Sequence, residues 1–237
     1  MNTIDPTMTL AALVDAHPQL AREFERRGLD YCCGGQQSLA DACAGRGLDA
    51  ATFSDLAATI TVDDAGDWSM LGAADLVDHL EATHHRYLWD EMPRLSALIA
   101  KVVSVHGERH PELGDVALCY EQARGDLEPH MLKEERVLFP MIRELAVATE
   151  PPSFHCGTLR NPISMMLREH DAVGGLLARL RQLTNGYQTP ADGCASYSAC
   201  FTALAELEAD THLHIHKENN VLFPLVLHME SELAVHR

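Results

Sequence analysis

Residues 133–141 read KEERVLFPM, and residues 217–225 read KENNVLFPL. His130 and His214 each stand three residues before their block, so the histidine repeats together with the block. The separation from His130 to His214 equals that from Glu134 to Glu218, and a fixed period of this kind indicates an internal duplication. Each copy also has the apolar spacing of an amphipathic helix, which predicts two equivalent helices.

Each copy contains a His-x-x-x-Glu motif, formed by His130 with Glu134 and by His214 with Glu218. A spacing of four places both side chains on one helix face, about 6 Å apart. Both glutamates fall within the apolar stripe, where a carboxylate is costly unless it is paired or bound to a metal. Two such carboxylates in a duplicated context therefore predict a shared cation.

Partner helices complete this candidate site with further histidines. His170 is flanked by apolar residues, and it follows His85 at nearly the period of the duplication. Helical phase leaves two candidates on the first helix, because His84 lies nearer the middle of the apolar stripe and His85 lies at its edge. Four imidazoles and two carboxylates from facing helices suit a pair of iron ions, with manganese or zinc as alternatives.

His106 is excluded from this centre by distance along its helix. It lies 21 residues beyond His85, which corresponds to about 31 Å at a rise of 1.5 Å per residue. We therefore assign His106 and His110 to the turn between the first two long helices.

The chain from residue 73 onward has the pattern of four long helices, typical of an antiparallel four-helix bundle. Pro129 lies inside the second helix and predicts a kink there, or else a division into two helices. The predicted helices run over about 74–105, from Pro111 to about 146, from a start at Asn161-Pro162, and from a start at Thr189-Pro190 to about 229.

A smaller helical module precedes the bundle, so the fold class is all-α with domains at 1–61 and 73–237. Helical spacing extends from Leu10 to Phe24 and stops at Gly28, and two more short helices are expected at 38–45 and 52–60. Residues 62–72 are acidic, contain glycine, and are interpreted as a linker.

Composition limits the possible partners. The chain has 237 residues, 35 acidic against 18 basic side chains, and a net charge of −17, so nucleic acid and anionic membranes would repel it. No apolar run reaches the ~18 residues needed to span a bilayer, and we find no secretory signal. Seven cysteines without framework spacing indicate reduced thiols and a cytoplasmic location.

Two more segments and the repeated blocks together carry a family resemblance. The segments are Asp30-Tyr-Cys-Cys-Gly-Gly35 and Val105-His-Gly-Glu-Arg-His-Pro111. The bundle resembles hemerythrin-type di-iron domains, and nearly the whole chain resembles the Repair of Iron Centres family of the YtfE/ScdA type. In the register of that family, the ligand on the first helix falls at His85.

The resemblance implies a stress-responsive protein that repairs iron–sulfur clusters damaged by nitric oxide or oxidants and that also binds nitric oxide. We expect damaged iron–sulfur proteins as partners, and a homodimer stays open. Two irons with an oxo or hydroxo bridge are the expected cofactor, with the glutamates bridging and the histidines as terminal ligands. The predicted metal ligands are His85, His130, Glu134, His170, His214 and Glu218.

Cys32 and Cys33 are the predicted catalytic thiols, on a module that moves between the bundle and solvent. Side chains of neighbouring residues diverge, so the pair is expected to be a poor chelate, while Gly34-Gly35 should leave the sulfurs accessible. The other five cysteines are interpreted as packing residues. Two alternative functions remain, a nitric oxide or oxygen scavenger or sensor without repair activity, and a redox enzyme acting on nitric oxide or peroxide.

Overall fold

The computed structural model describes residues 4–53 and 68–235 of the chain. Within these residues the regular structure is helical, apart from two isolated β-bridges. The all-α fold expected from the sequence is therefore confirmed. None of the described helices is long and apolar enough to cross a membrane.

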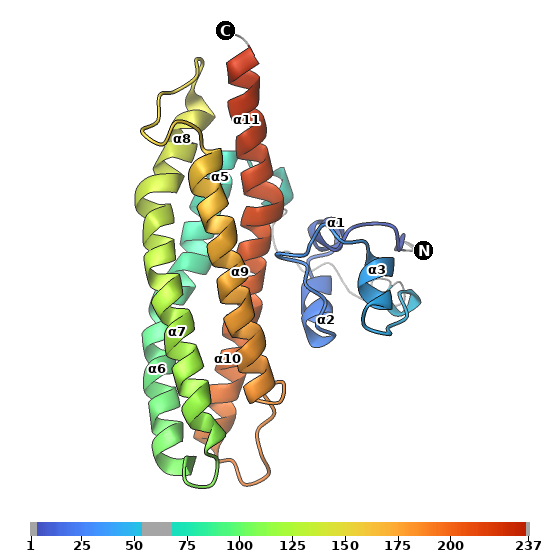
Figure 1. The fold of residues 1–237 in the computed structure, drawn as a ribbon, viewed down its shortest axis with the longest axis vertical. Helices are drawn as coiled ribbons and strands as arrows, with labels where there is room; N and C mark the ends of the chain where they lie inside the picture. Colours follow the sequence, from blue (N-terminus) through green and yellow to red (C-terminus); the bar gives the residue numbers. More distant parts are fainter. Residues whose placement is uncertain (1–3, 54–67, 236–237) are drawn as a thin grey trace.

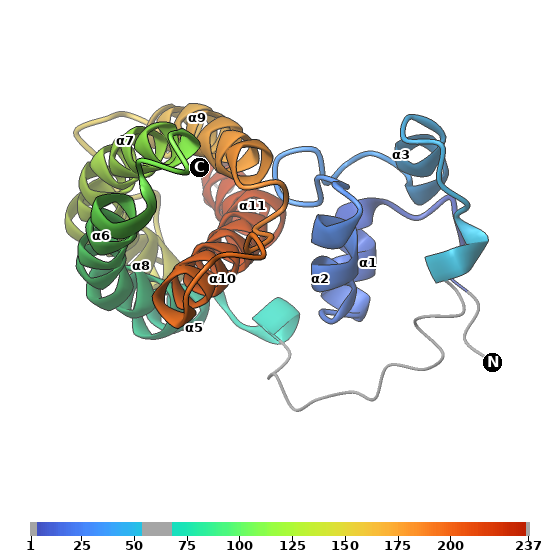
Figure 2. The ribbon, with the colours of Figure 1, turned by 90° about the horizontal axis from the view of Figure 1, so that it is seen from below.

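Four long rods of helix lie side by side around a common axis (Figures 1 and 2). The first comprises α5 (Ala73–Leu80), η2 (Glu81–His85) and α6 (Arg86–His106), and the second comprises α7 (Glu112–Lys133), η3 (Glu134–Leu138) and α8 (Phe139–Val147). The third is α9 (Arg160–Leu183), and the fourth comprises α10 (Ala195–His216), η4 (Lys217–Leu222) and α11 (Phe223–Val235). Helix α7 packs on α6 and α9, and α10 also packs on both, which closes the bundle.

Three of the four rods contain a π-helical segment, at η2, η3 and η4. A π turn inserts one extra residue and so rotates the side chains that follow it around the helix axis. The segments include His85, Glu134 and Glu218, which are three of the six predicted metal ligands. The apolar periodicity of the sequence does not reveal these segments, because a single π turn departs from the α-helical period over only five or six residues.

Two hydrophobic clusters fill the interior, one on each side of the predicted ligands. Along the first rod, Leu80 belongs to one cluster and Leu88 to the other, and His85 lies between them. Along the third rod, Met166 and Val173 flank His170 in the same way. The polar centre thus lies between two hydrophobic layers of side chains, which shield it from bulk solvent along the bundle.

The N-terminal module contains α1 (Leu10–Ala16), α2 (Leu20–Arg26) and α3 (Leu39–Ala44). The single helical run expected from Leu10 to Phe24 is wrong, because the chain breaks around Pro18 into two helices. The helix expected at 38–45 is present as α3, and the Ser38 side chain caps it by accepting from the Asp41 N–H at 3.1 Å.

Two expected segments lie partly outside the described residues. Residues 51–53 are helical, and the remainder of the helix expected at 52–60 lies outside. Of the expected linker at 62–72, residues 62–67 lie outside, while Trp68–Met70 forms the 3₁₀ helix η1 and Gly72 caps α5.

Two predicted helix starts are wrong. Helix α9 begins at Arg160 and not after Asn161, whose amide instead donates to the Cys156 carbonyl at 2.8 Å. Pro162 still lies in the first turn, where its missing N–H has no cost. Thr189-Pro190 opens a tight turn, closed by the Gly193 N–H and the Pro190 carbonyl at 2.8 Å, so α10 begins at Ala195.

Pro129 does not divide the second rod. Helix α7 continues through it to Lys133, so the alternative of two helices that meet at Pro129 is wrong. The irregular turn begins five residues after this proline, at Glu134. The expected kink at Pro129 stays a prediction.

The module packs on the fourth rod of the bundle, on the side of α10 and α11 (Figure 2). His216 lies with its Nε2 atom 2.9 Å from Asp15, and the Asn220 amide donates to the Cys32 carbonyl at 3.0 Å. Gly35 is required at this contact, because a Cβ there would lie 2.9 Å from the Asn220 side-chain oxygen and 2.4 Å from a backbone oxygen.

Candidate metal centre

Six buried side chains converge in the middle of the bundle. Their ligand atoms form two groups, and within each group all of these atoms lie within 4.8 Å of one another. Both groups contain Glu134 and Glu218, so the two carboxylates are shared. The first group adds His85 and His214, and the second adds His130 and His170.

The carboxylate oxygens of this centre suit a bound cation. All four oxygens of Glu134 and Glu218 are buried and, within the described part of the chain, have no hydrogen-bond donor. The imidazoles face them from 3.1 to 3.4 Å without hydrogen-bonding geometry. Buried carboxylates without donors are costly, and a metal ion between imidazole and carboxylate would satisfy both. The residues present therefore fit the metal implied by their chemistry.

The charges of the centre are strongly coupled. Burial and the nearby Glu218 raise the pKa of Glu134, but the imidazoles of His130 and His85 outweigh both and lower it to about 2. Burial lowers the pKa of His130, but Glu134 and Glu218 outweigh burial and raise it to about 9. The raised pKa values of His130 and His85 favour protonated imidazoles beside the carboxylates, and a metal ion would replace those protons.

His85 faces the centre, and His84 does not. The Nε2 atom of His85 lies 3.2 Å from that of His214 and 3.4 Å from Glu134. His84 accepts at Nε2 from Lys217 at 2.8 Å and donates at Nδ1 to Asp210 at 2.9 Å. Helical phase favoured His84 because it assumed a regular α-helix, whereas the π turn of η2 rotates His85 inward.

The outer nitrogen of three of these histidines is hydrogen-bonded. His85 pairs with Glu135 at 3.0 Å, and His130 pairs with Glu169 at 2.9 Å. His170 donates to the Asn219 side chain at 2.7 Å. Such partners fix the ring orientation of a ligating histidine. Sequence reasoning missed them, although Glu135 and Asn219 each directly follow a predicted bridging glutamate.

Residues 30–35 of the module are called the thiol loop. Three residues of this loop, Asp30, Cys32 and Cys33, form a third group that could bind a metal. The expectation that the thiols diverge is wrong, because their sulfurs lie 3.9 Å apart. The Asp30 carboxylate causes this by accepting from the backbone N–H groups of Cys32 and Cys33 at 3.1 and 2.9 Å, which bends the loop around it.

Access to the two sulfurs differs. Cys32 is 5% exposed, so the expectation of an accessible sulfur is wrong for this residue, while Cys33 is half-buried. The adjacent Cys33 thiol and burial raise the pKa of Cys32 well above its ordinary value. The loop presents Cys33 as its accessible thiol.

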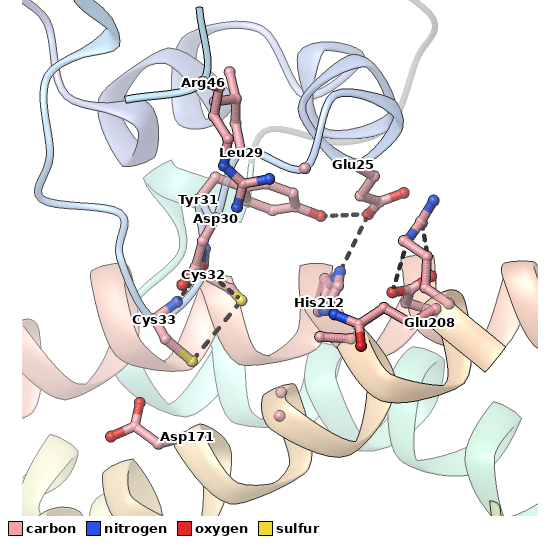
Figure 3. A pocket seen from close by; sticks show the side chains of 16 residues that line it. Glu25, Leu29, Asp30, Tyr31, Cys32, Cys33, Arg46, Asp171, Glu208 and His212 are labelled. Carbon is pink, nitrogen blue, oxygen red and sulfur yellow. Dashed lines mark hydrogen bonds and ion pairs between the residues drawn. The ribbon is translucent and has the colours of Figure 1, made fainter. Parts of the chain in front are cut away.

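A cavity of about 530 Å³ lies between this loop and the bundle (Figure 3). Gly174 and Gly175 of α9 line it opposite the thiols. A Cβ atom on Gly174 would lie 4.0 Å from the Cys33 sulfur, and Gly174 follows His170 by about one helical turn. The cavity therefore places the thiols beside the helix that carries one of the predicted ligands.

His106 and His110 lie at the turn between α6 and α7, as expected, and outside the six-residue centre. Cys194 at the start of α10 is exposed, so its interpretation as a packing residue is wrong. Arg109 lies 3.3 Å from Nδ1 of His106, and because a guanidinium can only donate, Nε2 of His106 donates to Cys194 at 3.1 Å.

We expect Cys194 to react as a thiolate near neutral pH. The hydrogen bond from His106 and the backbone N–H groups at the start of α10 lower the pKa of Cys194 to about 7. Its alkylation by iodoacetamide should therefore rise through about pH 7, and His106→Leu should move this rise toward the ordinary thiol pKa of about 8.5. Peptide mass spectrometry at several pH values measures it. His110→Leu is the control, and an equal shift in that variant would contradict the role of His106.

A helical bundle that encloses paired His and Glu ligands defines the hemerythrin-like class of cation-binding proteins. Residues 76–226 match the family described as "Hemerythrin HHE cation binding domain", and residues 6–58 match ScdA_N, a domain of unknown function. The chain belongs to the hemerythrin HHE family and, with its ScdA_N domain, to the ScdA/YtfE group named by the resemblance in the sequence.

Curated relatives align over most of the chain. The iron-sulfur cluster repair protein ScdA of Staphylococcus haemolyticus is 32% identical over 216 residues, which cover 90% of this chain and 95% of that protein. A probable iron-sulfur cluster repair protein of Haemophilus influenzae is 33% identical over 224 residues, with 92% and 96% coverage. The iron-sulfur cluster repair protein YtfE of Escherichia coli O6:K15:H31 is 32% identical over 219 residues, which cover 92% of this chain and 96% of that protein.

Proposed function

We propose that this protein binds two iron ions and repairs iron–sulfur clusters damaged by nitric oxide or oxidative stress. The observation that carries the proposal is the pair of His₂Glu₂ groups that share both carboxylates. The names of the relatives, iron-sulfur cluster repair proteins with the same two domains, support the choice of activity. Damaged iron–sulfur proteins are the partners that this function requires.

His85 and His214 would hold one ion and His130 and His170 the other, and Glu134 and Glu218 belong to both groups and so would be shared by the two ions. Bound iron would supply the chemistry for binding a small ligand such as nitric oxide. The two hydrophobic side-chain layers shield the imidazole and carboxylate groups from bulk water. The second rod supplies His130 and Glu134, and the fourth supplies His214 and Glu218, so the two rods hold the bridging carboxylates in place.

The thiol loop is the proposed route from the centre to a damaged cluster. Iron in the bundle has nitrogen and oxygen ligands, whereas an iron–sulfur cluster needs iron on sulfur. Cys33 is half-buried at the cavity, and Asp30 and Cys32 lie close enough to ligate the same ion. We place this chemistry in the cytoplasm, where the seven free cysteines would stay reduced.

A repair assay tests this function. Wild-type protein loaded with iron should restore activity to an iron–sulfur enzyme damaged by nitric oxide. The Cys32→Ser/Cys33→Ser variant should keep its iron and its nitric oxide binding but repair more slowly, because hydroxyl groups are poor iron ligands compared with thiolates.

Iron analysis, the nitrosyl absorption spectrum and recovered client activity are the three measurements. The control variant is Cys156→Ser/Cys194→Ser, which removes two thiols outside the module and should repair as wild type does. Full repair by the Cys32/Cys33 variant would remove the thiols from the mechanism. Nitric oxide binding without repair by the wild-type protein would favour a scavenger or sensor.

A further inference from the structure

The two metal positions can be compared residue by residue because the bundle is duplicated. The first half supplies His85, His130 and Glu134, and the second half supplies His170, His214 and Glu218 in the same order and at nearly the same offset. Each group takes one histidine from each half. The position held by His85 and His214 is called position A, and the position held by His130 and His170 is called position B. The duplication maps one onto the other.

The hydrogen-bond partners of the Nδ1 atoms of His85 and His170 differ in charge between the two positions. His85 of position A pairs with Glu135 at 3.0 Å, and its counterpart His170 donates to Asn219 at 2.7 Å. Glu135 and Asn219 each come directly after the bridging glutamate of their half and so occupy equivalent places. A carboxylate therefore supports one histidine and an amide supports the other, and both rings have an acceptor.

The surroundings of the Nδ1 atoms of His130 and His214, the second pair of equivalent ligands, differ more. His130 of position B pairs with Glu169 at 2.9 Å, and Glu169 also binds the ammonium group of Lys133. The residue equivalent to Glu169 is His84, because each directly precedes the ligating histidine of its rod. Its ring stacks on His214 with 5.5 Å between centroids and 6° between planes, so it offers His214 no acceptor. The Nδ1 atom of His214 is buried and has no hydrogen-bond partner anywhere in the described ranges.

A buried ammonium group adds to this asymmetry. Lys217, the counterpart of Lys133, is 3% exposed and donates to His84 and to His79, each at 2.8 Å. Its ammonium also lies 4.5 Å from the centre of the Trp68 ring. No carboxylate of residues 4–53 or 68–235 forms an ion pair with it, whereas Lys133 is paired with Glu169. Asp210 is linked to this ammonium only through His84, so a cation at position A has a less compensated positive charge nearby than a cation at position B.

We propose that the two ions are held unequally, with the ion at position A bound more weakly than the ion at position B. A histidine that ligates through Nε2 carries a proton on Nδ1, and leaving that N–H buried without an acceptor costs free energy. Loss of one such partner typically lowers metal affinity by about 10- to 100-fold. This inference rests on the proposed pair of irons and identifies the ion that leaves first during repair.

The test is a titration of the metal-free protein with Co²⁺ in the presence of a coloured competing chelator. Wild type should bind two ions with dissociation constants that differ by about 10- to 100-fold. His84→Glu gives His214 an acceptor and Lys217 a counter-charge, so it should tighten the weaker step. Glu169→Gln should weaken the tighter step, and Glu135→Gln should weaken the weaker step further.

His228→Glu is the matched control, because it makes the same exchange of histidine for glutamate on α11, outside the six-residue centre, where the side chain is 70% exposed. Circular dichroism shows whether each variant is folded. If His84→Glu is unfolded, Glu169→Gln and Glu135→Gln still test whether the two ions are held unequally. Equal dissociation constants in wild type, or weakening of the same step by both glutamine variants, would overturn the inference alone. Fewer than two bound ions in wild type would instead overturn the proposed di-iron function on which it rests.

Discussion

Glu134→Leu combined with Glu218→Leu is expected to abolish metal binding while the bundle stays folded. These carboxylates are the two groups shared by both metal positions, so their loss leaves four neutral imidazoles and no negative ligand charge. Leucine extends the two hydrophobic clusters that already border the centre, and replacing buried charges by apolar groups is often neutral or stabilising. Each single variant should lower the metal content or leave a single ion bound.

Metal analysis after gel filtration, with circular dichroism on the same sample, measures both parts of this result. Glu208→Leu is the matched control, since Glu208 is buried but pairs with Arg181 outside the centre. That variant should lose stability and retain its metal. Two tightly bound ions in the double leucine variant would exclude a bridging role for the glutamates.

Removal of the metal by a chelator should lower the Tm strongly with little loss of helix. Binding to the folded state at a free concentration a thousandfold above the Kd contributes about 4 kcal/mol. For a chain of 237 residues, each kcal/mol corresponds to about 2–4 °C, so we expect a decrease of roughly 8–16 °C. Helix content should persist because both hydrophobic clusters remain packed without the ion.

Thermal melts followed by circular dichroism, with and without chelator, test this expectation. The double leucine variant is its internal control, because its Tm should not respond to the chelator. Re-addition of ferrous ion under anaerobic conditions should restore the wild-type Tm. A wild-type Tm that is unchanged by complete metal removal would show that the ion contributes nothing to folding.

The duplication made the centre of the bundle predictable from sequence. His-x-x-x-Glu motifs inside apolar stripes can be recognised locally, because burial and a fixed helical spacing dictate which side chains face inward. The choice between His84 and His85 required more, since the π turn of η2 changes the phase within five residues. Thr189-Pro190 was predicted to start a helix but forms a turn, because threonine followed by proline is common in both.

Contacts between distant parts of the chain were not predictable. The position of the module depends on His216 with Asp15 and on Asn220 with Cys32, pairs separated by 201 and 188 residues. No local pattern specifies such pairings, because they arise from the complementary shapes of two folded surfaces. The outer partner Glu169 was missed for the same reason, as it reaches His130 from another rod.

The side chain of Asn219 accepts from His170 at 2.7 Å and donates to the Cys32 carbonyl at 3.4 Å, so one amide serves both the centre and the module. Thermodynamic reciprocity applies to any two equilibria that share such a group. Whatever free energy a docked module gives to metal binding through His170, a bound metal gives back to docking of the module. Metal binding and docking of the module are thus coupled equilibria. Undocking the module would lower the affinity for metal by the same factor by which loss of the metal would lower the equilibrium constant for docking.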